Sequence, residues 1–125
     1  MIIDTNALSA IADNEPGIHP VMARALVAAI PAIVLGEYVF GIMQSARSSQ
    51  HQKWLRENLP AFRVLDVTEQ TAEYYAGLRL ELRRAGTPIP SNDLWIAALC
   101  REHNLPVLSR DRHFDRVAGL RRVEW

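Results

Sequence analysis

Short apolar runs alternate along the chain with stretches of helical periodicity. The segment "MII" at the start predicts a short strand, and "FRVLDV" over 62–67 alternates as a half-buried strand does. Near the end of the chain, "LPVLS" over 105–109 predicts a buried strand and "RRVEW" over 121–125 an edge strand. Strands and helices in alternation are typical of an α/β sheet, so we expect that fold class.

The segments between these strands carry the helical spacing. Over 21–30, Met22, Leu26 and Ile30 recur at helical intervals, and Pro31 is expected to end that helix. The clearest helix runs over 68–86, with Thr68 and acidic residues at its start, a basic pair in its last turn and Gly86 after it. Four more helices are predicted, over 6–14, 32–46, 49–59 and 93–104, and a turn with a short helix over 110–120.

The length and net charge of the chain agree with a single α/β domain and do not indicate a particular partner. The chain has 125 residues, 49% of them hydrophobic, which predicts one domain spanning residues 1–125. Its 14 basic and 14 acidic residues cancel, so any contact with nucleic acid must come from local charge placement. All basic residues except Lys53 are arginine, the side chain suited to forked phosphate contacts.

A single cysteine, Cys100, excludes an internal disulfide and favours a reducing compartment, so we expect a cytoplasmic protein. The start of the chain has no signal-peptide pattern, and no apolar run approaches membrane-spanning length, so no membrane contact is expected. His103 shares a helix face with Cys100, but two ligands do not make a zinc site.

Four acids stand at comparable places in this pattern. Asp4 follows the first strand, Asp93 begins a helix, and Asp111 follows the strand that ends in "VLS". Parallel neighbouring strands would bring these three acids to one edge of the sheet. Glu37 lies in an unusually apolar helix, which favours a pocket wall over an ordinary surface position.

Each acid also has an ordinary structural interpretation. Asp4 and Asp111 suit helix caps or turns, and Asp93 could interact with a helix dipole while Ser91 or Asn92 caps the helix. Clustered carboxylates repel one another and lose solvation, which destabilises a fold unless a cation is present. Oxygen ligands without a supporting pattern of His or Cys favour Mg²⁺ or Mn²⁺.

The stretches "MIIDTNALSA", "IVLGEYVFGI" and "IPSNDLWIAALCREHNLPVLSRDRHFDRVAGL" resemble the acidic blocks of the PIN-domain family. The resemblance is strongest to the VapC-type toxins of type II toxin–antitoxin pairs. It covers nearly the whole chain and implies a three-layer PIN-like domain, with a central, mainly parallel sheet flanked by helices. One departure concerns "PAIVLGE", where many relatives carry a hydroxyl residue shortly before the glutamate.

The resemblance implies a divalent-metal-dependent ribonuclease that hydrolyses RNA phosphodiester bonds, with Mg²⁺ or Mn²⁺ as cofactor. It implies four residues as both catalytic groups and metal ligands: Asp4, Glu37, Asp93 and Asp111. Their expected companions in the second shell or at the substrate are Thr5, Asn6, Ser109, Arg110 and Arg112. A bound metal ion would lower the pKa of a water molecule and neutralise charge on the phosphate. Glu37 or Asp111 could instead orient the water.

For other polar and aromatic residues the ordinary structural interpretation is favoured. Asp115 is expected to pair with a nearby arginine, and the second arginine group, Arg79, Arg83 and Arg84, to form a solvated face. Arg110 and Arg112, which flank Asp111, are the better candidates for phosphate contact. Tryptophans can stack on RNA bases, but the expected roles are core packing for Trp95 and a terminal anchor for Trp125.

The expected partners are an RNA substrate, a cognate antitoxin and a second copy of the chain in a homodimer. Apolar residues near the acids exceed what one small core needs, and some are expected to anchor the antitoxin: Leu8, Ile11, Ala12, Tyr38, Val39, Ile42 and Met43. The alternative function is a catalytically silent PIN-like module that binds RNA or protein. A haloacid-dehalogenase-type phosphatase or a receiver domain would need a suitably placed lysine, and the chain has only Lys53.

Overall fold

Five short strands form one parallel sheet in the computed structural model, which describes residues 1–125. Their order across the sheet is β3-β2-β1-β4-β5, and every neighbouring pair is parallel. The strands are β1 (Ile2–Ile3), β2 (Ala29–Pro31), β3 (Arg63–Leu65), β4 (Val107–Leu108) and β5 (Arg122–Val123). The predicted α/β class with a parallel sheet is therefore confirmed.

The centre of the sheet is fully buried because helices cover both of its faces. Ile2 of β1 pairs with Ala29 on one side and Val107 on the other, and all three residues are completely buried. Strands buried on both faces need apolar side chains at every position, which explains the unbroken "MII" and "VL" runs. The outer strand β3 is mostly exposed except for Leu65, in keeping with its position at the sheet edge.

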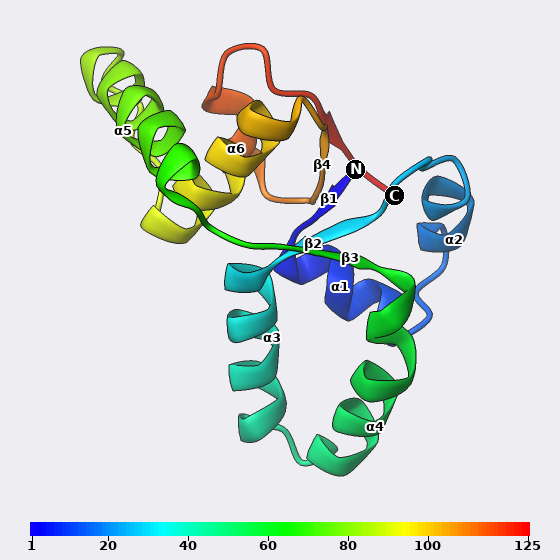
Figure 1. Ribbon diagram of the computed structural model, residues 1–125. Helices are drawn as coiled ribbons and strands as arrows, with labels where there is room; N and C mark the ends of the chain where they lie inside the picture. Colours follow the sequence, from blue (N-terminus) through cyan, green and yellow to red (C-terminus); the bar gives the residue numbers. More distant parts are fainter.

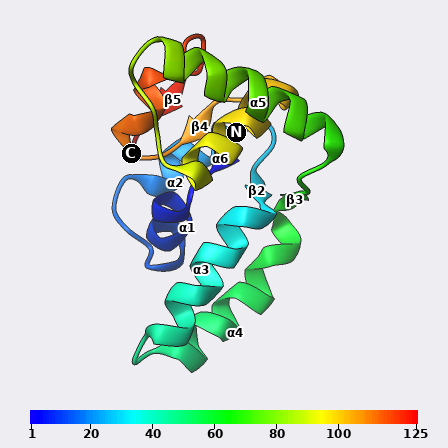
Figure 2. The same ribbon diagram turned by 90° about the vertical axis from the view of Figure 1, so that its left-hand side faces the viewer.

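Six α-helices surround the sheet (Figures 1 and 2). They are α1 (Thr5–Ala12), α2 (Ile18–Met22), α3 (Ala32–Gln44), α4 (Ser48–Asn58), α5 (Glu69–Arg84) and α6 (Ser91–His103). Two short 3-10 helices, η1 (Leu59–Ala61) and η2 (Arg112–Arg116), complete the chain. In both views α3 and α4 lie side by side and extend away from the sheet, while α5 lies along α6 on the opposite side. No helix has the length and apolar content needed to cross a membrane.

The predicted start of α5 is confirmed in detail. Thr68 is the N-cap, its hydroxyl accepts from the backbone N–H of Thr71, and the Thr71 hydroxyl accepts in return from the Thr68 N–H. This reciprocal pair satisfies two backbone donors that a helix start otherwise leaves open. At the other end Gly86 adopts a positive φ of 69°, a conformation in which glycine carries no steric cost.

The predicted helix over 21–30 is wrong. Helix α2 ends at Met22, and residues 29–31 form β2, in which Ile30 pairs with Val64. Ile30 is fully buried, whereas Leu26, from the same apolar series, is completely exposed. A short apolar run carries no signal that separates a buried strand from a helix, and here strand pairing with β1 and β3 decided the outcome.

The connectivity fixes where a ligand site can form. From β1 the chain moves outward through β2 and β3, and it then crosses back to place β4 on the other side of β1. In open parallel sheets, the crevice beyond the carboxyl ends of two strands at such a reversal is the usual ligand site. In this chain Asp4 follows β1 and Ser109 follows β4, so both residues stand at that crevice.

Candidate active site

Asp4 lies at the centre of the crevice with three hydrogen-bond donors around its carboxylate. The backbone N–H of Thr5 donates over 2.8 Å, the Asn6 amide over 2.7 Å and the Ser109 hydroxyl over 2.6 Å. Asp4 is only 4% exposed and also serves as the N-cap of α1. The cap interpretation from the sequence is therefore correct, and it holds the carboxylate at the point where the strands diverge.

Ser109 links the two strand ends. Its hydroxyl donates to Asp4 and accepts from the Asn6 amide (3.1 Å) and from the backbone N–H of Asp111 (2.9 Å). The Asn6 side-chain oxygen in turn accepts from the backbone N–H of Arg110. The expected companions Asn6 and Ser109 thus join the loop after β4 to the start of α1.

Glu37 reaches the same place from α3. The Thr5 hydroxyl donates to one of its carboxylate oxygens and the Asn92 amide to the other. These two donors supply the side-chain contacts that the sequence "PAIVLGE" lacks. Asn92 precedes Asp93, so the start of α6 holds Glu37 and carries the third acid.

Asp93 and Asp111 both contact one nitrogen of an imidazole. His113 Nδ1 lies 3.0 Å from an oxygen of Asp93 and 3.1 Å from an oxygen of Asp111. Asp111 also caps η2 by accepting from the backbone N–H of His113, as its ordinary interpretation predicted. For Asp93 that interpretation is wrong in one respect, because the N-cap of α6 is Pro90 rather than Ser91 or Asn92.

Burial and mutual repulsion act in the same direction on these acids. Burial raises the pKa of the Asp4 carboxyl, the hydrogen bonds from Ser109 and Thr5 lower that pKa, and the charges of Glu37 and Asp111 raise it. Burial likewise raises the pKa of Asp93, which the hydrogen bond from His113 lowers and the nearby Asp111 and Asp4 charges raise. Ionised carboxylates in this cluster therefore oppose folding until a cation compensates their charge.

The donor set fits a divalent metal ion. One ligand atom each from Asp93, Asp111 and His113 lies within 4.8 Å of the others, and Asp4 is close enough for its charge to affect Asp93. Carboxylate oxygens are the ligands preferred by Mg²⁺ and Mn²⁺, and an imidazole is a common ligand of transition metals. The sequence predicted oxygen ligands without histidine, whereas the structure adds His113 to the two carboxylates.

The arginines beside the cluster differ in their contacts. Arg110 pairs with Glu15 and lies over the ring of Trp125, 4.1 Å from its centroid. Arg112 is exposed and forms no ion pair within 4.0 Å, although its charge helps to lower the pKa values of Asp115 and Glu124. Asp115 pairs with Arg122, as expected from the sequence, and does not join the acids.

A second cavity adjoins Glu37 between α1, α3 and α4. It has a volume of about 260 Å³, and Glu37, Tyr38 and Asp13 are among the residues that line it. The Tyr38 hydroxyl is buried there without a hydrogen-bond partner. The expected setting of Glu37 in a pocket wall is confirmed.

Several of the apolar residues expected to anchor a partner belong instead to the core. Leu8, Tyr38 and Ile42 are at most 6% exposed, because they fill the space between α1 and α3. The exposed apolar residues of α3 are Phe40 (62%) and Met43 (70%). Any partner that lies along α3 would meet these two side chains.

His113 and Asn92 were missed at the sequence level. His113 stands two residues after an aspartate that caps a short helix, and such a cap brings the two side chains together, so this spacing was the available signal. Asn92 gave no signal, because its contact with Glu37 joins residues 55 positions apart.

The chain as a whole is similar to several known proteins. Residues 1–120 match the PIN domain family. The chain is 28% identical to ribonuclease VapC2 of Rickettsia felis over 99% of its own length and 96% of that protein. It is 30% identical to the tRNA(fMet)-specific endonuclease VapC of Salmonella typhimurium, covering 77% of this chain and 74% of the relative. A chain in the crystal structure of VapBC2 from Rickettsia felis bound to a promoter DNA fragment has a similar fold, with a TM-score of 0.87 and 27% sequence identity. The match covers 99% of this chain and 97% of that chain.

Proposed function

The chain belongs to the PIN-domain family, and from that membership we propose that it is a ribonuclease acting as the toxin of a type II toxin–antitoxin pair. The similar proteins carry the names ribonuclease and tRNA-specific endonuclease. The observation that carries the proposal is the convergence of Asp4, Glu37, Asp93 and Asp111 at the crevice between β1 and β4.

Hydrolysis of a phosphodiester at this site needs a divalent ion, for which we propose Mg²⁺ or Mn²⁺ held by Asp4, Asp93 and Asp111, with His113 close by. When bound, the ion acidifies a water molecule and neutralises charge on the phosphate. The raised pKa values of Asp4 and Asp93 support this assignment, because such a cation offsets the repulsion between the acids.

The chain's own residues position the reacting groups. Asn6 and Ser109 hold the Asp4 carboxylate in one orientation from both sides of the crevice. Thr5 and Asn92 hold Glu37 in one orientation, with one hydrogen-bond donor on each carboxylate oxygen. We propose that Glu37 accepts the proton of the attacking water, since it is not among the residues whose ligand atoms cluster, Asp93, Asp111 and His113.

Arg112 is proposed to contact the substrate phosphate, because it is exposed, has no carboxylate oxygen within 4.0 Å and follows Asp111 directly. Arg110 is already engaged by Glu15 and Trp125, so we expect it to contribute less. RNA is the proposed substrate class. Residues 1–125 are proposed to act as a single domain because all five strands belong to one sheet.

The partner is proposed to be an antitoxin protein, since similar structures are of VapBC complexes. Phe40 and Met43 offer exposed apolar contacts on α3, the helix that carries Glu37, and a basic side chain of the partner would be attracted to the acids. A homodimer is also proposed. The buried free thiol of Cys100 supports a reducing location, for which we propose the cytoplasm.

The proposal is tested by incubating the purified chain with RNA in Mg²⁺, in Mn²⁺ and in EDTA. Cleavage is expected with either metal and not in EDTA, and Asp4→Asn should abolish it while the protein stays folded. A folded parent protein that cleaves no RNA under any of these conditions would contradict the proposal and favour a catalytically silent binding module.

A further inference from the structure

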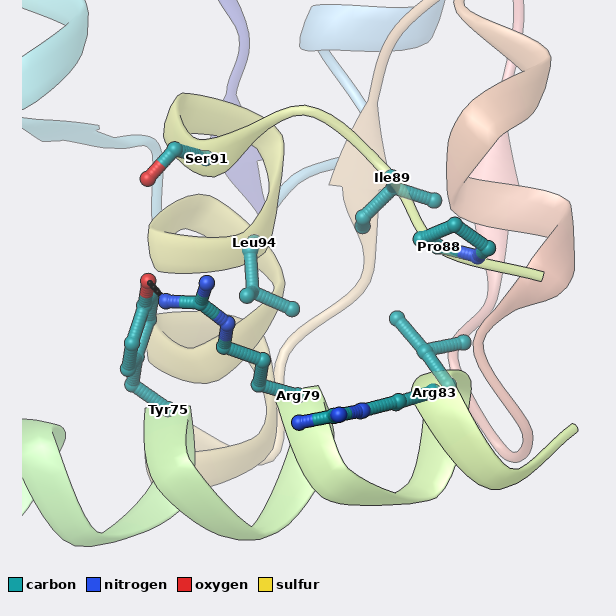
Figure 3. A pocket seen from close by; sticks show the side chains of 8 residues that line it. Tyr75, Arg79, Arg83, Pro88, Ile89, Ser91 and Leu94 are labelled. Atoms are coloured by element: carbon teal, nitrogen blue, oxygen red, sulfur yellow. Dashed lines mark hydrogen bonds between the residues drawn. The ribbon is translucent and has the colours of Figure 1, made fainter. Parts of the chain in front are cut away.

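A cavity with two arginines in its lining lies between α5 and the start of α6. It has a volume of about 330 Å³ and opens between α5, the loop before α6 and the first turn of α6. Its lining combines apolar and cationic side chains: Tyr75, Arg79, Leu82, Arg83, Pro88, Ile89, Ser91 and Leu94. Figure 3 shows the two arginines rising from α5 below Ser91 and Leu94 of α6.

The two guanidinium groups lack acidic partners. Arg101, Arg110 and Arg122 each pair with a carboxylate, whereas no carboxylate oxygen lies within 4.0 Å of Arg79 or Arg83. Like charges four residues apart on one helix face destabilise it. An anion bound between them would remove that repulsion.

Arg79 is held in place by aromatic side chains. It donates to the Tyr75 hydroxyl over 3.0 Å (Figure 3), and the Tyr75 ring stacks on Trp95 with centroids 3.9 Å apart. Arg83 has no hydrogen-bond partner and extends along α5 toward Arg79 (Figure 3). Arg79 is therefore held in one position, whereas Arg83 can move toward a ligand. The buried side chains of Leu82 and Leu94 form the apolar part of the cavity wall.

The start of α6 connects this cavity to the acids. Ser91 lines the cavity, Asn92 donates to Glu37, and Asp93 contacts His113. Ser91 and Asp93 are two residues apart, about 3 Å along the helix axis, so both sites meet the first turn of α6. A nucleic-acid strand carries one phosphate per nucleotide, so a strand that lies over the first turn of α6 would offer successive phosphates to the two sites.

We propose that the cavity between Arg79, Arg83 and Ser91 binds an RNA phosphate that flanks the scissile phosphodiester. This inference rests on the proposed ribonuclease function. Two guanidinium groups suit a phosphate because their N–H donors match its oxygens in pairs. The site would position the strand over the first turn of α6 and thereby present the next phosphodiester to Asp93.

The test uses the double variant Arg79→Gln/Arg83→Gln with Arg84→Gln as the matched control. Arg84 also lies in the last turn of α5 and is exposed, but it does not line the cavity. In cleavage of a short single-stranded RNA with Mg²⁺, the double variant should raise KM about tenfold with kcat unchanged. Arg84→Gln should match the parent, and Arg→Lys changes at both positions should restore part of the loss because they keep the charge.

A neutral methylphosphonate placed singly along the RNA identifies the contact. At one position flanking the cut it should raise the parent's KM, and the same substitution should have no further effect in the double variant. The slope of log(1/KM) against log salt should also become shallower by about 0.7 in the double variant, the value for one phosphate of a single strand.

Three results would overturn the inference. The double variant could behave like Arg84→Gln while the parent cleaves RNA, which would leave the ribonuclease function standing. It could change from a dimer to a monomer in size-exclusion chromatography, which would identify the cavity as an interface between copies. A folded parent that cleaves no RNA would remove the proposed function and this subsite together.

Discussion

Replacing Ser109 with alanine removes the hydroxyl that joins the two strand ends at the acids. Ser109 is fully buried, and its hydroxyl donates to Asp4 while accepting from Asn6 and from the backbone N–H of Asp111. The change leaves the backbone and the packing of β4 intact, since alanine is smaller and tolerated in the same conformation. The expected loss is therefore electrostatic.

The magnitude follows from these contacts. A hydrogen bond to a charged acceptor contributes about 1.5–3 kcal/mol, and the Asp111 N–H also loses its partner. We expect a destabilisation of about 3 kcal/mol. For a chain of this length the unfolding entropy is about 0.26 kcal/mol per kelvin, so the melting temperature should fall by about 10 °C.

The loss should also depend on pH. Burial places the pKa of Asp4 above its ordinary value, and the Ser109 hydrogen bond partly opposes that shift. Because a raised carboxyl pKa favours folding only while the group is protonated, ionised Asp4 opposes folding above its pKa and needs Ser109 most there. The difference between parent and Ser109→Ala should therefore be largest near pH 7 and shrink as Asp4 becomes protonated at acidic pH.

Thermal melts in EDTA at several pH values measure this effect, with Ser9→Ala as the control. The Ser9 hydroxyl donates only to the backbone oxygen of Thr5 within α1, so its loss should change the melting temperature little. If Ser109→Ala and Ser9→Ala melt within about 2 °C of each other at pH 7, the hydrogen-bond network around Asp4 does not have the energetic role assigned to it.

Two further predictions concern the metal site and the buried tyrosine. Saturating Mg²⁺ or Mn²⁺ should raise the parent's melting temperature by about 10 °C, since a ligand at a hundred times its Kd adds about 2.7 kcal/mol to the free energy of unfolding. The Asp111→Asn variant should lose most of this gain, and EDTA should remove all of it. Equal gains in the parent and in Asp111→Asn would mean that the ion binds elsewhere. The Tyr38→Phe variant should melt at the parent's temperature or a few degrees higher, because the buried Tyr38 hydroxyl has no hydrogen-bond partner to lose. A large fall in the melting temperature would mean that this hydroxyl forms a hydrogen bond in solution.

The sequence predicted the acids better than it predicted their surroundings. Asp4 and Asp111 follow buried apolar runs, so strand ends and carboxylates could be located together from local pattern alone. Glu37 stood out because an acid in an apolar helix is unusual. These signals are local, and they suffice to bring the acids to one edge once the sheet is parallel.

Other features depended on tertiary contacts. Ile30 belongs to a strand only because β1 and β3 pair on either side of β2, which no spacing along 21–30 indicates. Asn92 and His113 acquire their roles through contacts with Glu37 and Asp93, far away in the chain. The cavity beside Arg79 likewise exists only because α5 packs on α6.

The most direct test of the central claim compares Asp93→Asn with Asp66→Asn in RNA cleavage. Asp66 also follows a parallel strand, β3, but it is exposed and lies at the sheet edge away from the crevice. With Mg²⁺ present, Asp93→Asn should lower kcat by orders of magnitude while Asp66→Asn cleaves at the parent rate. Equal rates for folded Asp93→Asn and the parent would contradict the assignment of the acidic crevice as the catalytic centre.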